Sequence, residues 1–230
     1  STEDNFNSEQ IENMQRIISE KMNDAASTDL YVAEIAIEID FITYNTYGSS
    51  VTNATNYAIA LMAASSAIYM KEENVRFVIP YIRVWTTTDP YTGTTSSALL
   101  NQFRNEWNTN QQSVQRTLAH FITRRGGGLG GIAWVNVLCS GVGGGYGYGF
   151  SGTDGPILPL PTYSWDVMVV SHEIGHNFGS PHTHSCSRPG GPIDSCYATE
   201  GGCYTGPIIP TLGTIMSYCH LSAGGISLTK

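Results

Sequence analysis

The chain has 230 residues, which is long enough for one well-buried domain and short for two. Its formal net charge is −8 and only 13% of its residues are charged, so it lacks the clustered Lys and Arg on which nucleic-acid binding depends. No apolar run approaches the roughly 20 residues that cross a bilayer. We therefore expect a single globular domain, monomeric, with neither a nucleic-acid nor a membrane partner.

Helix-like and strand-like patterns alternate over the first part of the chain. Residues 8–23 place apolar side chains at helical spacing, and residues 30–45 alternate apolar and polar side chains as a strand with one buried face does. Residues 53–74 are rich in Ala, Leu, Ile and Met, which indicates a buried helix. Residues 75–87 are β-branched and aromatic, and Pro80 indicates an edge position or a bulge in that strand.

The alternation continues to about residue 140. A helix-like pattern covers residues 96–124, with a candidate break near Asn108, and residues 130–140 predict a short strand. This order is typical of helices packed on a largely parallel sheet. Gly and Pro then predominate, with room for one strand, until a helix predicted from about Trp165 to Phe178 and an irregular chain to the end. The Gly-rich runs lack a phosphate-loop signature and are interpreted as turns.

The cysteines are concentrated near the C-terminus. Four of the five lie within 34 residues in a segment rich in Gly and Pro, and no C-x-x-C pair occurs, which favours disulfides over a second metal site. These four are Cys186, Cys196, Cys203 and Cys219; Cys139 leaves one cysteine over, and the pairing stays open. Disulfides predict a secreted, extracellular protein. The start at Ser1 without methionine predicts a processed chain.

The segment HEIGHNFGSPH at residues 172–182 predicts a zinc site. His172 and His176 are four residues apart on a helix and share one face, where two imidazoles can hold two corners of a tetrahedral zinc ion. Glu173 is turned about 100° from His172, beside the metal, where a carboxylate can take a proton from water. Gly179 can end the helix in a left-handed conformation and return His182 as the third ligand.

This segment resembles the zinc signature of the metzincin metalloendopeptidases, and GTIMSYCH at residues 213–220 resembles their Met-turn. The resemblance implies that Met216 forms a hydrophobic floor beneath the zinc ion. The Asn-Phe pair after His176 and the stretch GGIAWVNVLC are most similar to the reprolysin (adamalysin/ADAM-like) branch, although Thr183 stands where reprolysins usually carry Asp. Tyr218 matches a tyrosine of astacins and serralysins that can reach the metal, and it either stabilises an oxyanion or only packs.

Together the pattern and the resemblance predict an α/β (α+β) metzincin-like fold. We expect a mixed, mostly parallel twisted sheet packed with helices, a zinc cleft, and then a small irregular disulfide-linked C-terminal subdomain. Residues 1–230 would form one catalytic domain, divided at about residue 182 into an N-terminal subdomain with the active-site helix and a C-terminal subdomain (183–230) with the Met-turn.

The function implied is that of a secreted zinc-dependent metalloendopeptidase made as a longer precursor with a pro-segment. Glu173 would act as the general base, and a protein or peptide substrate would pair in extended form with a sheet edge near Gly131–Val137. The S1′ pocket would be walled by the chain around Tyr218 and between Cys186 and Thr214. One alternative is a catalytically silent zinc-binding adhesive or inhibitory domain, which the presence of Glu173 opposes. Another is a small-molecule amidase, against which the open Gly-rich region favours a polymeric substrate.

Five further residues have more than one interpretation. His184 and His220 lie close to the zinc signature in sequence, and solvent exposure is favoured over a role with substrate or metal. His120 lies on a helical pattern and is interpreted as structural. Asp154 and Asp166, near the start of the active-site helix, either cap that helix or bind Ca²⁺, and capping is favoured.

Overall fold

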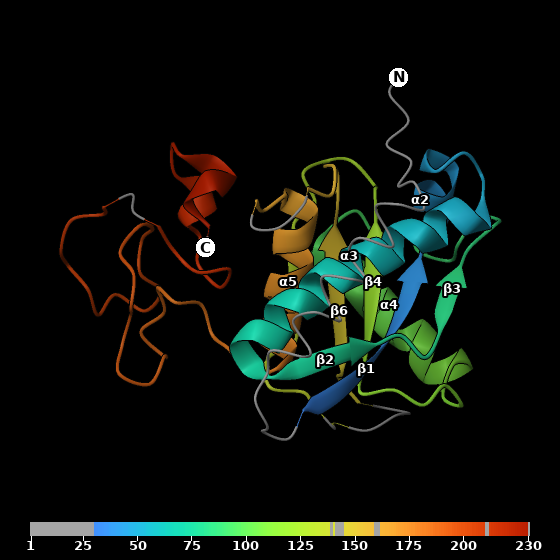
Figure 1. Cartoon of the computed structure of the whole chain (residues 1–230), viewed down its shortest axis with the longest axis horizontal. Helices are drawn as coiled ribbons and strands as arrows, with labels where there is room; N and C mark the ends of the chain where they lie inside the picture. Colours follow the sequence, from blue (N-terminus) through green and yellow to red (C-terminus); the bar gives the residue numbers. More distant parts are fainter. Residues whose placement is uncertain (1–29, 139, 141–144, 159–161, 210–211, 230) are drawn as a thin grey trace.

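The computed structural model describes residues 30–138, 140, 145–158, 162–209 and 212–229. The helix predicted at residues 8–23 and the fifth cysteine, Cys139, lie outside these residues. A sheet with helices on both faces forms one side of the molecule, and the chain that follows the last long helix forms an irregular segment beside it (Figure 1). Within the described part of the chain, no helix is both long and apolar enough to cross a membrane.

The described elements follow the predicted alternation with four additions: a helix at 41–46, a strand at 118–123 and two short 3-10 turns near the C-terminus. The strand predicted at 75–87 is also divided into two. The strands are β1 (Tyr31–Ile39), β2 (Val75–Val78), β3 (Ile82–Val84), β4 (Leu118–Thr123), β5 (Gly131–Ala133) and β6 (Tyr148–Gly152). The helices are α2 (Phe41–Thr46), α3 (Val51–Glu73), α4 (Ser96–Asn110) and α5 (Trp165–Asn177), followed by the short 3-10 turns η1 (Cys219–Leu221) and η2 (Gly225–Leu228).

The sheet is largely parallel, as predicted. Its order is β2-β1-β4-β6-β5, with β3 also paired to β1, and β5 is the antiparallel strand, at the edge beside β6. β2 and β3 pair with the same side of β1. Glu34 is opposite Val78 and Ile37 is opposite Ile82, so the outer strand has one extra residue between these pairs. Pro80 lies in this bulge on an edge strand, which confirms its interpretation.

Two hydrophobic layers hold the helices on the sheet. Ile35, Ile37 and Ile39 of β1 face one cluster, which contains α3 and α5, while Ala36 faces a second cluster with α4 (Figure 1). The alternation follows from the period of two along a strand. Trp107 of α4 is fully buried in the second layer, where the burial of a large side chain contributes about 2–3 kcal/mol.

Three of the predicted elements are wrong in part. The strand predicted for 30–45 ends at Ile39, because the Asp40 carboxylate accepts the Thr43 N–H at 2.9 Å and caps α2. The helix predicted for 96–124 ends at Asn110, and the last part of that range is β4, every residue of which is buried. The strand predicted for 130–140 has three residues, 131–133.

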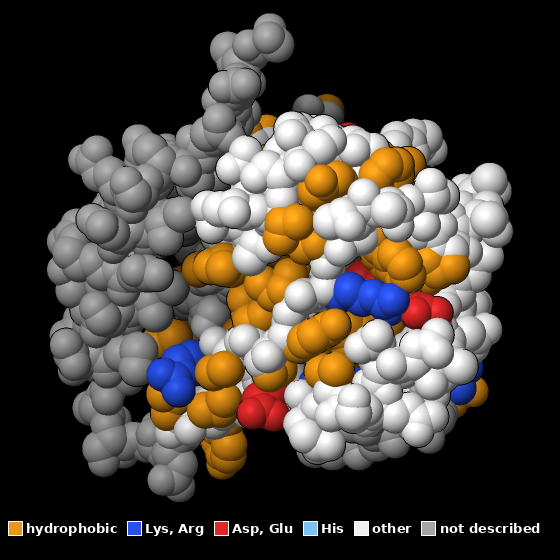
Figure 2. All heavy atoms as spheres, turned by 90° about the vertical axis from the view of Figure 1, so that its right-hand side faces the viewer, with side chains coloured by type: hydrophobic (Ala, Val, Ile, Leu, Met, Phe, Trp, Pro, Cys, Tyr) orange, Lys and Arg blue, Asp and Glu red, His pale blue; other side chains and the backbone are white. Residues whose placement is uncertain are grey.

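The low charge of the sequence is visible on the surface. The face shown in Figure 2 presents mostly uncharged polar and apolar side chains, with few Lys, Arg, Asp or Glu among its described residues. The full chain has 11 basic and 19 acidic residues.

Candidate metal centre

The helix α5 presents the motif because it is capped at both ends. The Ser164 hydroxyl accepts the Val167 N–H at its start, and Gly179 has a φ of 102° just after its end. The Gly179 N–H and the Ser180 N–H donate to the carbonyls of His176 and Gly175, both at 2.9 Å. The left-handed glycine predicted at this point is confirmed, and it turns the chain back over the helix.

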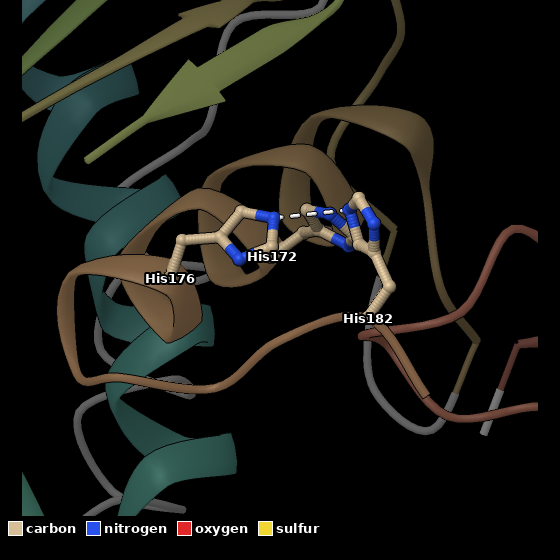
Figure 3. Close-up of side chains that lie close together, drawn as sticks. All are labelled: His172, His176 and His182. Carbon is tan, nitrogen blue, oxygen red and sulfur yellow. Dashed lines mark hydrogen bonds between the residues drawn. The ribbon is translucent and has the colours of Figure 1, made fainter. Parts of the chain in front are cut away.

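The turn brings three imidazoles together. Figure 3 shows His172 and His176 projecting from α5 and His182 from the chain that follows, with their ring nitrogens turned toward one another. One nitrogen from each of the three lies within 4.8 Å of the other two, and the Nε2 atoms of His176 and His182 are 3.1 Å apart. Two nitrogens bound to one tetrahedral zinc ion lie roughly 3.4 Å apart, so this cluster has the size of a zinc site.

The outer nitrogen of each imidazole has its own partner. The His172 Nδ1 donates to the Ile215 carbonyl at 2.7 Å, the His176 Nδ1 to the Ser180 carbonyl at 2.8 Å, and the His182 Nδ1 to the Glu200 carboxylate at 2.7 Å. Donation from Nδ1 leaves the Nε2 lone pair free for a metal. Burial lowers the pKa of His172 to about 3 and also lowers that of His176, which keeps both neutral as a metal ligand must be.

The Met-turn packs against α5, the helix that carries two of the three histidines. A Cβ on Gly175 of α5 would overlap the Met216 sulfur, so the thioether lies directly against the helix backbone. The Met216 carbonyl accepts the Thr183 N–H at 3.0 Å, and the preceding residue, Ile215, provides the carbonyl that holds His172. Thr183, which stands in place of the Asp usual in reprolysins, is buried and lies 3.5 Å from the Thr214 hydroxyl.

Glu173 lies between the histidines and the edge strand. Its side chain is buried, and its Oε2 has no hydrogen-bond partner among the described residues. A Cβ built on Gly131 of β5 would lie 2.6 Å from the Glu173 Cδ and would overlap Oε1 and Cγ, so the carboxyl group fills the space that this glycine leaves. Burial raises the pKa of Glu173 to about 8, a shift that is typical of functional carboxyl groups.

Tyr218 packs on the same cluster. Its ring centroid is 4.4 Å from that of His182 and 5.9 Å from that of His172. Burial, with a smaller effect from the charges of Glu173 and Glu200, raises the pKa of Tyr218 to about 12. The phenol is therefore neutral and can donate a hydrogen bond, while its reach to a metal stays a prediction.

Two of the other histidines are not exposed as expected. His184 is fully buried under Tyr218 and Tyr197, with ring centroids 4.7 and 5.7 Å away. His220 is half-buried against Trp165. Both expectations were wrong, because Tyr197 and Tyr218 of the C-terminal segment pack on His184, whereas Trp165 of α5 packs on His220.

His120 belongs to a strand and not to a helix. It is buried in β4, where its Nε2 lies 2.9 Å from the Ser151 hydroxyl of β6. Complete burial lowers its pKa to about 3. The ring is therefore a neutral member of the sheet core.

The two aspartates do not cap α5. Ser164 is the N-cap, while Asp166 accepts the N–H groups of Asp154 and Gly155, both at 3.0 Å, and the Tyr57 hydroxyl at 2.8 Å. Asp166 thus fixes the loop that enters the helix. In the described part of the chain, neither Asp154 nor Asp166 belongs to a group of three potential metal ligands.

Glu200 is the residue near the site that the sequence did not reveal. It lies 18 residues after His182, in the segment crossed by the disulfides Cys186–Cys203 and Cys196–Cys219. These two bonds confirm the prediction that the clustered cysteines cross-link this segment. A backbone bridge between Ser185 and Glu200 places the carboxylate beside His182, and no periodic pattern in the sequence encodes such a contact.

A cavity of about 580 Å³ lies on another face of α5. It is lined by Ser171 and Gly175 of α5, by Phe178 just after that helix, by the end of α3, and by residues 214–216. Part of the predicted S1′ wall, including Arg188 and Thr214, lines this cavity, but Tyr218 does not. Neither Glu173 nor any of the three clustered histidines is among its lining residues, which do include Ile215 and Met216 of the Met-turn.

Comparison with known proteins agrees with this geometry. Disintegrin and metalloproteinase domain-containing protein 10 of Xenopus laevis is 26% identical over 182 residues, which are 69% of this chain and 24% of that protein. The chain thus spans about a quarter of that relative. A chain of a solved structure described as a chaperone-substrate complex superposes with a TM-score of 0.51 at 15% identity, over 68% of this chain and 24% of the other, which bears on the fold alone. The family model for metallo-peptidase family M12, of reprolysin type, matches residues 9–223. The matched range contains the helix α5, the returning His182 and the Met-turn. The chain belongs to this family.

Proposed function

We propose that the chain is a zinc-dependent metalloendopeptidase that hydrolyses internal peptide bonds of proteins. The observation that carries the proposal is the position of Glu173. Its buried carboxyl group lies against Gly131 of the edge strand β5 and is next in sequence to His172 of the three-histidine cluster. A buried carboxyl group, a three-histidine cluster and the last strand of the described sheet therefore lie together, an arrangement that supports peptide hydrolysis.

The histidines His172, His176 and His182 would hold the zinc ion through Nε2. Zinc held there would supply Lewis acidity toward a water molecule and the scissile carbonyl. The charge of a cation bound beside Glu173 would oppose the burial that raises its pKa, so the ionised carboxylate would take a proton from the attacking water and deliver it to the nitrogen of the leaving amine. Proton transfer by a positioned side chain contributes about 10²- to 10⁴-fold to such a reaction.

The substrate would bind in extended form along β5. This strand pairs with β6 on one side and is the last in the sheet. No described strand pairs with its other side, where a peptide could add by β-augmentation. Tyr218, a neutral donor beside His182, would stabilise the negative charge that develops on the scissile oxygen.

Secretion belongs to the same proposal. The described C-terminal segment contains only two short 3-10 turns and is cross-linked by two disulfides. Disulfides persist in oxidising compartments and are rare in the cytosol. A loop-rich segment of this kind therefore supports an extracellular protein.

The test is the cleavage of a denatured protein by the purified chain, with and without a chelator. The variant Glu173→Gln keeps the size of the side chain and removes the proton acceptor, and Glu34→Gln makes the same change at an exposed site on β1. We expect cleavage that the chelator abolishes, that zinc restores, that Glu34→Gln retains and that Glu173→Gln lowers by about 10²-fold or more.

Three other outcomes would contradict the proposal in different ways. One bound zinc per chain without cleavage of any protein would indicate a silent zinc-binding domain. Hydrolysis of small amides but not of peptides would indicate an amidase. Cleavage that Glu173→Gln leaves unchanged would refute the role of this carboxylate while leaving the peptidase activity.

A further inference from the structure

We propose that His184 and Glu200 form a second zinc site beside the three-histidine cluster. His182, His184 and Glu200 each offer a ligand atom within 4.8 Å of the other two. The group shares His182 with the first cluster but faces its outer nitrogen, Nδ1. The inference goes beyond the proposed function and rests on it in one respect only, the assignment of His182 Nε2 to the first zinc ion.

The buried state of His184 is the first argument. Its relative exposure is 0%; among the described residues its Nδ1 has no hydrogen-bond partner, and its Nε2 has only the Glu200 carboxylate, at 3.6 Å. A buried polar group without a partner is destabilising, so natural proteins seldom contain one without a function. A bound cation would supply the missing partner.

The distances are the second argument. The His184 Nε2 and the Glu200 Oε1 are 3.6 Å apart, which is too far for a good hydrogen bond. Nitrogen and oxygen ligands of one tetrahedral zinc ion, each at about 2.0–2.2 Å from the metal, lie roughly 3.4 Å apart. The pair therefore fits zinc with a shift of only a few tenths of an ångström.

The backbone holds this pair in place. The Glu200 N–H donates to the His184 carbonyl at 3.1 Å, and the Cys186 N–H donates to the Glu200 carbonyl at 2.8 Å. The disulfide Cys186–Cys203 closes the loop around them. The Glu200 side chain is 45% exposed and the His184 side chain is fully buried, so an ion would enter from the Glu200 side.

The ligand set points to zinc and to a weaker site than the first. One imidazole and one carboxylate suit zinc and other late divalent metals better than Ca²⁺ or Mg²⁺, which prefer oxygen alone. His182 donates its Nδ1 proton to Glu200 at 2.7 Å and is therefore not free to bind through that atom. With two protein ligands in place of three, the second ion should bind about tenfold or more weakly than the first.

A third group of possible ligands does not compete with this assignment. It consists of Asp194 with Cys196 and Cys219, and both sulfurs are used in one disulfide.

The test counts metal and does not depend on cleavage. The chelator-stripped chain is dialysed against free zinc from below micromolar to millimolar, and bound zinc is measured by atomic emission. We expect two ions per chain, of which the weaker is lost in His184→Phe, which keeps a buried ring, and in Glu200→Gln, which keeps an acceptor for His182. Glu34→Gln serves as the matched control and should retain both ions.

Failure of this proposal is distinguishable from failure of the proposed function. The double variant His172→Ala, His176→Ala removes the first site and should still bind one zinc ion with the weaker affinity. One ion per chain at millimolar zinc, or a second ion that persists in both His184→Phe and Glu200→Gln, would overturn the proposal. Melting curves establish that each variant is folded.

Discussion

Gly131 of β5 offers a direct test of the position of Glu173. The substitution Gly131→Ala adds one methyl group to a strand residue whose backbone has no positive φ, so the backbone itself tolerates alanine. The new Cβ would lie 2.6 Å from the Glu173 Cδ, whereas carbon atoms in contact are about 3.5 Å apart or more. The carboxyl group must therefore move by about 1 Å.

The consequences for activity and stability differ in size. A displacement of about 1 Å in a catalytic group costs about 10²-fold in rate, so kcat/KM should fall by that factor. Overpacking destabilises the fold by about 1–3 kcal/mol. Alanine loses less conformational entropy than glycine on folding, which offsets about 0.5–1 kcal/mol of this cost. We expect a net loss of about 1 kcal/mol in the free energy of unfolding.

Gly130→Ala is the matched control. A Cβ at Gly130 has nothing within 4 Å and the residue has no positive φ, so activity and stability should stay near those of the original chain. The assay is the hydrolysis of a quenched fluorescent peptide, with zinc content and denaturant unfolding measured on the same samples. If Gly131→Ala cleaves within twofold of Gly130→Ala at equal zinc content, Glu173 is not held against β5. If it loses zinc as well, the loss of rate does not report on Glu173.

Three further outcomes are expected. Tyr218→Phe should lower kcat by about 10²-fold with little change in KM, because an oxyanion donor acts only in the transition state; a change in KM alone would indicate a packing role. Glu200→Ala should weaken zinc binding by about 10- to 100-fold, because His182 loses the acceptor of its Nδ1 proton. Glu200→Gln keeps an acceptor and should bind the first zinc ion nearly as well as the original chain. Equal losses of affinity in the two variants, measured by competition with a chelator, would contradict this. His120 has a native pKa of about 3 against about 6.5 when unfolded, so between these values the unfolded chain binds more protons and stability falls as the pH falls. The free energy of unfolding of the zinc-loaded chain, measured with denaturant, should therefore fall between pH 6.5 and pH 5. In His120→Gln this fall should be about 2 kcal/mol smaller than in the original chain, and equal falls would refute the pKa shift.

The features predicted correctly from the sequence are those that local rules determine. The active-site helix, its glycine stop and the returning His182 lie within a few turns of chain, where helical spacing and the left-handed preference of glycine decide the geometry. Pro80 marked the bulge on the edge strand for a similar reason, because proline has no N–H to donate. The largely parallel sheet followed from the alternation of helices and strands.

The element misjudged at residues 118–124 shows where local rules fail. β4 is central in the sheet and buried on both faces, so its sequence LAHFIT has no alternation of apolar and polar residues. Leu118, Phe121 and Ile122 also fit a helical spacing, and a short apolar run cannot be assigned by its period alone. The position of the strand between β1 and β6 decides its conformation, and that position is a property of the whole fold.

The partners of the metal-binding histidines were harder to predict than the histidines. Two of the three Nδ1 acceptors are backbone carbonyls, of Ser180 and Ile215, which any residue can provide. The third, Glu200, is near His182 only because the chain folds back through the Ser185–Glu200 bridge. A sequence pattern can identify side chains that bind a metal, but it does not identify the backbone oxygens that orient them.

The disulfides connect this outer layer of contacts to the stability of the C-terminal segment. Cys186–Cys203 encloses Glu200, and Cys219 of the second disulfide follows Ile215 by four residues. The disulfides close loops of 17 and 23 residues. In the chain-entropy account, each closure stabilises the folded state by about 3 kcal/mol. The described helices of this segment are two 3-10 turns. The disulfides therefore contribute a large part of what keeps the Ile215 carbonyl and the Glu200 carboxylate in place. We therefore expect the orientation of His172 and His182, and with it the metal affinity proposed for the three-histidine cluster, to depend on the oxidised cysteines.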